Sequence, residues 1–264
     1  MRILITGAAG LIGRKLTRRL EREHELRLAD VQPLAGDARF VACDVTRPDE
    51  IQLAARGIDA VIHLAIASGH EGEYEDDEFN QRRFDVNVKG TWNVLEAARR
   101  AGVRRFVHTS SLMVLWGYAP PEWVPADAAA RPVGTYAQTK YLAENLCEQA
   151  ALMSGLSVVC LRIAKPIDLD DASWKHRTLR PQWIAFPDLL DAYRLAVTAA
   201  DIKFEIITIV GESSRRRWDL SKAERILGYR PQYRLEDLGY TLEPELPPIL
   251  PHSATDPLYS AQRL

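Results

Sequence analysis

The chain has 264 residues, of which 47% are hydrophobic and 27% charged, a composition typical of a folded globular protein. That length suits one large α/β domain with a small appended lobe rather than two independent domains. A formal net charge of -2 and the lack of a bilayer-length apolar run exclude general electrostatic binding to nucleic acid and insertion into a membrane.

Strand-like and helix-like patterns alternate through the first two-thirds of the chain. Buried strands are expected over residues 3–6, 26–30, 39–42, 60–64, 105–109 and 157–163. Helices are expected over residues 10–23, 84–100 and 136–153, and a glycine follows each of the last two. This alternation predicts an α/β fold over residues 1–163, a Rossmann-type doubly wound parallel sheet with helices on both faces.

The pattern loosens after residue 163. Residues 164–185 lack a clear period, and the segments that follow are expected to be a helix over 187–199, a strand over 203–210 and a helix over 220–227. We expect 164–264 to form a small substrate-binding lobe, continuous with the core, that ends from Glu243 onward in a proline-rich extended tail. The acidic stretch 71–78 is either a lid or, in the simpler interpretation, a solvated loop.

The three cysteines, Cys43, Cys147 and Cys160, form neither a spaced metal motif nor an even set for disulfides. They are typical of a reducing compartment, so we expect a cytoplasmic protein without a metal site. The chain opens directly on a strand pattern, which predicts that no signal peptide precedes the fold.

A glycine-rich turn lies where the first predicted strand passes into the first helix. It reads Thr-Gly-Ala-Ala-Gly-Leu-Ile-Gly over residues 6–13. Its glycines permit a tight turn, close approach of a pyrophosphate and close packing of helix on strand, and in that order they are Gly7, Gly10 and Gly13. Leu11 and Ile12 open the helix, whose free N–H groups favour phosphates. The turn therefore predicts a dinucleotide site.

Other strand ends carry residues that suit the same ligand. Asp30 ends the second predicted strand, where its carboxylate can accept hydrogen bonds from the adenosine ribose and repel a 2′-phosphate. This position favours NAD over NADP, against the simpler interpretation of Asp30 as a turn residue. The third strand end, with Asp44 and Val45, is expected to contact the adenine. The fourth strand end, with Leu64 and Ala65, is expected to contact the ribose and its nicotinamide.

Tyr136 and Lys140 open the long helix at positions i and i+4 and so share one helix face. Free tyrosine titrates near ~10, too high for an efficient base, and a neighbouring ammonium lowers that pKa. Ser111 follows a strand and should lie on the ligand-binding rim, where its hydroxyl can hold a substrate oxygen. A Tyr/Lys pair at this spacing often occurs by chance on a protein surface. The same pair together with a serine at a strand end is less often a coincidence. We expect Tyr136 to be the base and Lys140 also to hold the nicotinamide ribose.

These motifs resemble the extended short-chain dehydrogenase/reductase family, which includes NAD-dependent epimerases and dehydratases of nucleotide-linked sugars. The residues that carry the resemblance are 6–13, Asp30, Asp44, 63–65, Asn87, 110–111 and 136–140. It implies NAD as the cofactor, with Ser111, Tyr136 and Lys140 as the catalytic residues and Asn87 as support for the cofactor site. The expected partners are a small-molecule sugar and further copies of the chain in a homo-oligomer.

Within that family the chain is most similar to the uronate dehydrogenases. Similar features include the short length, residues 26–30 and 161–163, and the tract from 216 to 229. This resemblance implies that Ser68 contacts the substrate. It also implies that an arginine of the loop over 174–182 binds the substrate carboxylate, and Arg177 and Arg180 are equal candidates.

Two departures from the uronate dehydrogenase pattern concern the substrate. Those enzymes carry Asn-His directly after the catalytic serine, whereas this chain has Leu112 and Met113, which suit a less polar sugar. The serine expected soon after the strand over 157–163 is replaced by Lys165. An added ammonium beside the arginines favours an anionic sugar.

Three functions compete. The leading one is an NAD-dependent dehydrogenase that oxidises the anomeric hydroxyl of a free sugar, first of all a uronic acid, to the lactone. The second is a nucleotide-sugar epimerase or dehydratase. The chain after Arg162 is short for a nucleotide-binding lobe, however, and Leu112 stands where dehydratases carry an acidic residue. The third is a dinucleotide sensor without catalysis, which would not need Ser111, Tyr136 and Lys140 together.

Overall fold

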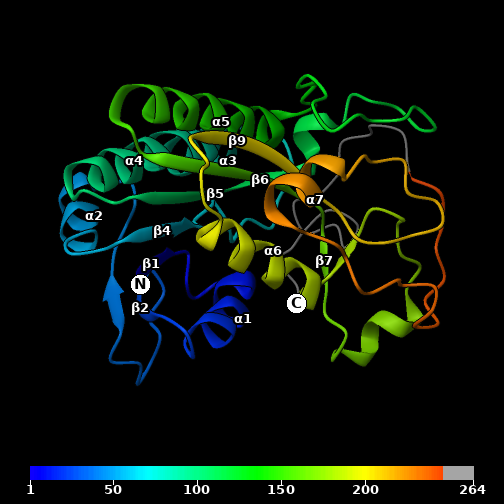
Figure 1. The fold of residues 1–264 in the computed structure, drawn as a ribbon, viewed down its shortest axis with the longest axis horizontal. Helices are drawn as coiled ribbons and strands as arrows, with labels where there is room; N and C mark the ends of the chain where they lie inside the picture. Colours follow the sequence, from blue (N-terminus) through cyan, green and yellow to red (C-terminus); the bar gives the residue numbers. More distant parts are fainter. Residues whose placement is uncertain (246–264) are drawn as a thin grey trace.

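The computed structural model describes residues 1–245, and within them seven parallel strands form the central sheet (Figure 1). Their order across the sheet is β3-β2-β1-β4-β5-β6-β9. The strands are β1 (Arg2–Thr6), β2 (Glu25–Asp30), β3 (Phe40–Ala42), β4 (Ala60–His63), β5 (Arg105–Ser111), β6 (Ser157–Ile163) and β9 (Phe204–Ile209). The predicted Rossmann-type, doubly wound parallel sheet is confirmed.

The strand order reverses at β1, because β2 lies on one side of it and β4 on the other. Ligands of open α/β sheets bind beyond the carboxyl ends of the strands at such a reversal. The glycine-rich turn after β1 and the residues after β4 therefore meet at the place where a dinucleotide is expected.

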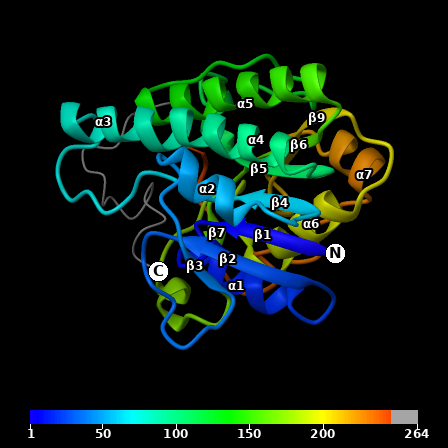
Figure 2. The same cartoon turned by 90° about the vertical axis from the view of Figure 1, so that its left-hand side faces the viewer.

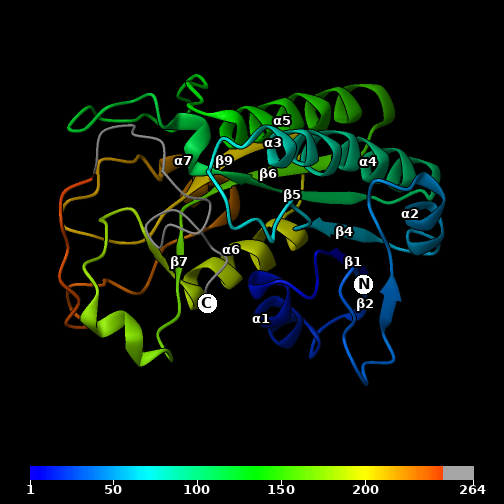
Figure 3. The ribbon, with the colours of Figure 1, turned by 180° about the vertical axis from the view of Figure 1, so that it is seen from behind.

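Helices cover both faces of the sheet (Figure 2, Figure 3). They are α1 (Leu11–Leu20), α2 (Pro48–Ala54), α3 (Asp77–Arg83), α4 (Thr91–Arg100), α5 (Thr135–Ser154), α6 (Phe186–Thr198) and α7 (Ser221–Leu227). On one face Ile5 of β1 joins Leu16 of α1 in a buried core, and on the other face Leu4 joins Cys147 of α5. Neighbouring residues of β1 thus enter opposite cores, as in a strand buried on both sides. None of these helices is long and apolar enough to span a membrane.

The structure corrects three local predictions. Residues 84–100 are not one α-helix, because a π-helix, η1 (Phe84–Gly90), precedes α4. The spacing of apolar residues does not reveal this change of hydrogen bonding. Helices α2 and α3 were not predicted, since seven residues make only about two turns and give little periodicity. The acidic stretch 71–78 is not simply a solvated loop, because Tyr74 is buried and Asp76 caps α3.

The chain after β6 contributes to the main sheet and to a second, smaller core. β9 completes the sheet, and α6 packs beside α1. A short strand, β7 (Pro166–Ile167), pairs with β8 (Ile184–Ala185), and their connection holds a 3-10 turn, η3 (Ala172–His176). Trp174 and Trp183 pack there with Leu235. The predicted division at residue 163 stays a prediction, and all but 243–245 of the predicted tail lies outside the described residues.

Candidate active site

A cavity of about 1080 Å³ lies over the carboxyl ends of the central strands. Most of the predicted site residues line it: Gly7, Gly10, Leu11, Ile12, Gly13, Asp30, Asp44, Val45, Leu64, Ala65, Ser68, Ser111, Tyr136, Lys140, Lys165 and Arg180. Asn87 and Arg177 are the two predicted residues that do not. One cavity therefore holds both the glycine-rich turn and the Ser-Tyr-Lys group.

The three glycines of the turn have different physical reasons to be glycine. Gly7 has φ +73°, and a Cβ there would lie 2.7 Å from the backbone nitrogen of Ala65. A Cβ on Gly13 would lie 2.6 Å from the carbonyl oxygen of Ala8, so close packing requires its absence. A Cβ on Gly10 would meet only the Gly7 carbonyl oxygen, at 3.3 Å. Gly10 thus leaves an open cradle at the N-terminus of α1, which fits a pyrophosphate.

Asp30 is held in one orientation at the end of β2. Its Oδ2 accepts a hydrogen bond from the Ala9 backbone N–H, and its Oδ1 accepts one from Gln32, each at 2.9 Å. A carboxylate has about four acceptor positions, so both oxygens can still accept from ribose hydroxyls. The turn interpretation and the ribose interpretation are therefore compatible, and the site fits NAD.

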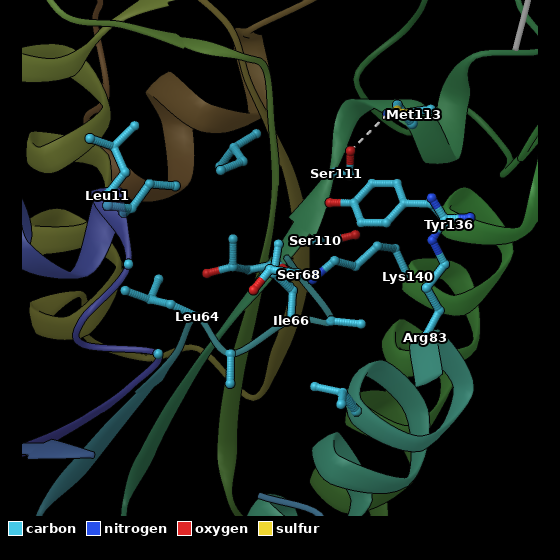
Figure 4. Close-up of a pocket in the computed structure, with 18 of the residues that line it drawn as sticks. Leu11, Leu64, Ile66, Ser68, Arg83, Ser110, Ser111, Met113, Tyr136 and Lys140 are labelled. Carbon is cyan, nitrogen blue, oxygen red and sulfur yellow. Dashed lines mark hydrogen bonds between the residues drawn. The ribbon is translucent and has the colours of Figure 1, made fainter. Parts of the chain in front are cut away.

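Ser111 and Tyr136 come to the same point of the cavity from β5 and α5. Figure 4 shows their hydroxyl groups turned toward one another. The Ser111 Oγ also accepts a hydrogen bond from the Met113 backbone N–H at 3.2 Å, which fixes its direction. Burial raises the pKa of Tyr136, whereas the hydrogen bond with Ser111 and the charge of Arg83 act to lower it. The pair can hold a hydroxyl group and accept its proton.

Lys140 lies one helical turn after Tyr136 and is only 2% exposed. Its Nζ donates to the Thr109 carbonyl oxygen at 2.8 Å and lies 5.9 Å from the centre of the Tyr136 ring. Burial lowers the pKa of Lys140 to about 8. Its ammonium is therefore poised to lose its proton only slightly above neutral pH.

A buried ion pair supports the strand end that carries Ser111, and the sequence analysis missed it. Glu144, one turn beyond Lys140 on α5, accepts a hydrogen bond from the Ser110 Oγ at 2.6 Å. Arg162 of β6 donates to both carboxylate oxygens of Glu144, each at 2.8 Å. Since both charged groups are almost fully buried, this fork ties α5, β5 and β6 together beside Ser111 and Lys140.

Asn87 lies behind the cavity, in the π-helix η1. Its Oδ1 accepts a hydrogen bond from the Ala67 backbone N–H at 2.9 Å, and its Nδ2 donates to the Thr139 Oγ1 at 3.0 Å. It joins the segment after β4 to α5. Its position fits a supporting role and does not put it in the cavity wall.

The structure distinguishes the two candidate arginines. Arg180 is buried and lines the cavity, and its Nη1 contacts the Pro244 carbonyl oxygen at 2.7 Å and Glu243 at 3.0 Å. Its Nε and Nη2 make no hydrogen bond to a residue within 1–245. Arg177 is exposed and stacks on Trp174, 4.9 Å from the ring centre, outside the cavity.

Several residues that line the cavity have no counterpart among the predictions. They are Tyr74, Arg83, Trp116, Gln182, Trp183 and Trp218. Lys165 lies among these aromatic rings, with its Nζ 4.8 Å from the centre of Trp183. The acidic stretch also belongs to this wall, because the Tyr74 hydroxyl reaches the Met113 Sδ at 3.9 Å. The sequence contains one signal of this packing, which is Tyr74, an aromatic residue among acidic ones.

A model of the NAD dependent epimerase/dehydratase family matches residues 3–167, which include the glycine-rich turn and the Ser-Tyr-Lys group. The chain belongs to this family. It is an NAD-dependent oxidoreductase acting on a CH–OH group. Within the described residues, no group of three or more histidine, cysteine or acidic side chains is arranged to hold a metal ion.

Two curated members of the family align with most of the chain. A uronate dehydrogenase from Pseudomonas syringae pv. tomato is 29% identical over 236 residues, which cover 88% of this chain and 82% of that enzyme. An L-arabinose 1-dehydrogenase (NAD(P)(+)) from Haloferax volcanii is 30% identical over 255 residues, with 88% and 96% covered.

Among solved structures, a mutant uronate dehydrogenase from Agrobacterium tumefaciens complexed with NAD superposes with a TM-score of 0.76. It is 26% identical, and the match covers 90% of this chain and 87% of that one. The likeness extends beyond the family model, into the chain after β6.

Proposed function

We propose that the protein oxidises the anomeric hydroxyl of a free sugar to the lactone with NAD, and that the sugar carries an acidic group. The observation that carries this proposal is that one cavity is lined by Ser111 and Tyr136, by the open cradle at Gly10, and by Arg180 with several tryptophans. A sugar bound in the same cavity as NAD would present a hydroxyl group to the base.

In the proposed reaction, Ser111 holds the anomeric oxygen by a hydrogen bond and Tyr136 accepts its proton. NAD, when bound along the glycine-rich turn, Asp30 and Lys140, supplies the acceptor for the hydride that leaves the anomeric carbon. Loss of that C–H bond and of the O–H bond leaves a carbonyl, which is the lactone. Because Lys140 and Tyr136 lie on one helix face, Lys140 orients the ribose beside the proton acceptor.

The relatives support a free sugar as the substrate class. Their names specify dehydrogenases of uronates and of L-arabinose at position 1. An acidic sugar is supported by Arg180, which lines the cavity and whose Nε and Nη2 make no hydrogen bond within residues 1–245, because arginine binds carboxylates in a bidentate fork. The tryptophan rings of the same cavity offer flat apolar surfaces to the C–H groups of a sugar ring.

A substrate screen tests the proposal directly. The purified protein is assayed with NAD against free aldoses, uronic acids and sugar nucleotides, and turnover is read from the absorbance of NADH. We expect NADH to form with at least one free uronic acid and the product to be a lactone by NMR. Turnover of sugar nucleotides without net NADH formation would instead identify an epimerase or dehydratase. NAD binding without any turnover would identify a sensor.

A further inference from the structure

Arg83, the last residue of α3, is an almost fully buried cation beside the catalytic tyrosine. Only 2% of it is exposed, yet it lines the cavity. Figure 4 shows its side chain reaching from α3 toward Tyr136. The buried cluster of Tyr74 and Phe79 that surrounds Arg83 also packs against Tyr136.

The guanidinium of Arg83 is fixed in one place by its neighbours. Its centre lies 4.3 Å from the ring centres of both Tyr74 and Phe79. Its Nη1 donates to the Tyr74 carbonyl oxygen and to the Asn80 Oδ1, each at 2.6 Å. These neutral partners hold the side chain without cancelling its charge.

Among the described residues, the counterion of that charge is Glu75, whose carboxylate forms a long ion pair with Nη1 at 3.9 Å and accepts no hydrogen bond from it. The Nε of Arg83 is buried and has no hydrogen-bond partner. A buried charge whose counterion is this far away still acts on its neighbours, because the effective dielectric constant is lower inside a protein than in water.

We propose that Arg83 is a positioning residue for proton transfer: its guanidinium, fixed between Tyr74 and Phe79, is the permanent positive charge that stabilises the phenolate of Tyr136. The inference concerns the base and does not depend on which sugar the protein oxidises. Its subject is a residue outside the Ser-Tyr-Lys group, on a helix that the sequence did not predict.

The other titratable groups around Tyr136 support the assignment of this role to Arg83. Lys140 faces the ring from the same helix, but burial lowers its pKa to about 8, so its charge fades as the pH rises. Arginine keeps its charge throughout that range. Tyr74 and Tyr193 also face Tyr136, and burial raises both of their pKa values, so they stay neutral. The charge of Arg83 acts to lower the pKa of Tyr136.

The ionisation of Tyr136 can be measured without any substrate. The chain has nine tyrosines, so the ultraviolet absorbance of tyrosinate is titrated in each protein and in its Tyr136→Phe counterpart, and the difference isolates Tyr136. We expect Arg83→Gln to raise the midpoint by about one pH unit, since an opposite charge at this range shifts a pKa by about that much. Arg83→Lys should keep the midpoint close to the wild-type value, because it keeps the positive charge.

Two substitutions of Asn80 separate the effect of the Arg83 charge from the structural role of Arg83, and both leave Arg83 in place. Asn80→Asp puts a carboxylate where the Oδ1 already contacts Nη1, and by neutralising the guanidinium it should also raise the midpoint. Both substitutions lose the hydrogen bond that the Asn80 Nδ2 donates to Glu75 at 3.0 Å. Asn80→Ala also removes the contact with Nη1 but adds no charge, so it should leave the midpoint unchanged. This pair decides the matter even if Arg83→Gln fails to fold. An equal midpoint in Asn80→Asp and Asn80→Ala would overturn the proposal and leave Arg83 a structural anchor for α3.

Discussion

The cavity wall is built from backbone in one region and from large side chains in another. The proposed dinucleotide end consists of the glycine-rich turn, the N-terminus of α1 and the small residues after β4, with the carboxylates of Asp30 and Asp44. The proposed substrate end consists of Arg83, Trp183, Arg180 and other large side chains, which come from the segments before α4, between β5 and α5, and after β6.

The difference reflects what each end must recognise. A pyrophosphate is bound by N–H groups that every residue carries, so the shape of the backbone decides the site and glycine spacing encodes that shape. A particular substrate is distinguished by its own charges and apolar faces, which only particular side chains can match. Ser111, Tyr136 and Lys140 line the same cavity, and the proposed reaction requires them whatever the substrate.

The largest effect is expected in this Ser-Tyr-Lys group. Tyr136→Phe removes the proton acceptor while keeping the ring, so turnover should fall by roughly 10²–10⁴-fold, the usual contribution of a general base. NAD affinity, measured by fluorescence titration of the same variant, should change little because the backbone cradle is untouched. Wild-type turnover in Tyr136→Phe would show that another group is the base.

Every residue that the sequence predicted for the dinucleotide site and for the Ser-Tyr-Lys group, apart from Asn87, lines the cavity. Gly7, Gly13 and Asp30 follow from local geometry, because a turn, a close approach or a strand end demands them at fixed spacings. The parallel sheet follows from the alternation of buried runs and amphipathic helices. Each of these features is a property of neighbouring residues in the chain.

The substrate end could not be predicted in the same way. Arg83 stands beside Arg82 in a charged segment, and only the tertiary packing of Tyr74 and Phe79 distinguishes it from an exposed arginine. Arg180 differs from Arg177 for the same reason, since the loop that holds both has no period. Their burial depends on contacts between segments that are distant in the chain, and the spacing of residues along the sequence does not predict such contacts.

The second largest effect concerns the buried ion pair beside the Ser-Tyr-Lys group. Glu144→Gln keeps the shape of the side chain but leaves the charge of Arg162 buried without its partner. Breaking a buried pair in this way costs about 3–5 kcal/mol, which urea unfolding at neutral pH should detect. Glu148→Gln, at an exposed position one turn further along α5, should change the free energy of unfolding by less than ~0.5 kcal/mol. Equal costs would show that the fork is not structural.

The smallest of these effects concerns Asp30, a charged side chain of the proposed dinucleotide end. NAD should be preferred over NADP by at least ~10-fold in kcat/KM, about 1.4 kcal/mol, because the carboxylate repels a 2′-phosphate. Asp30→Asn should narrow that preference, whereas Asp44→Asn, which removes a charge at the next strand end, should preserve it. Equal use of both cofactors by the wild-type protein would contradict the role given to Asp30.

The most direct test of an acidic sugar as substrate compares matched pairs, galacturonate with galactose and glucuronate with glucose. In the wild-type protein the acid should exceed its neutral partner by roughly 10²-fold in kcat/KM, about 2.7 kcal/mol. Arg180→Gln should erase that margin, while Arg177→Gln, at the exposed arginine of the same loop, should preserve it. Equal rates on acid and neutral sugar in the wild-type protein would contradict the proposed function.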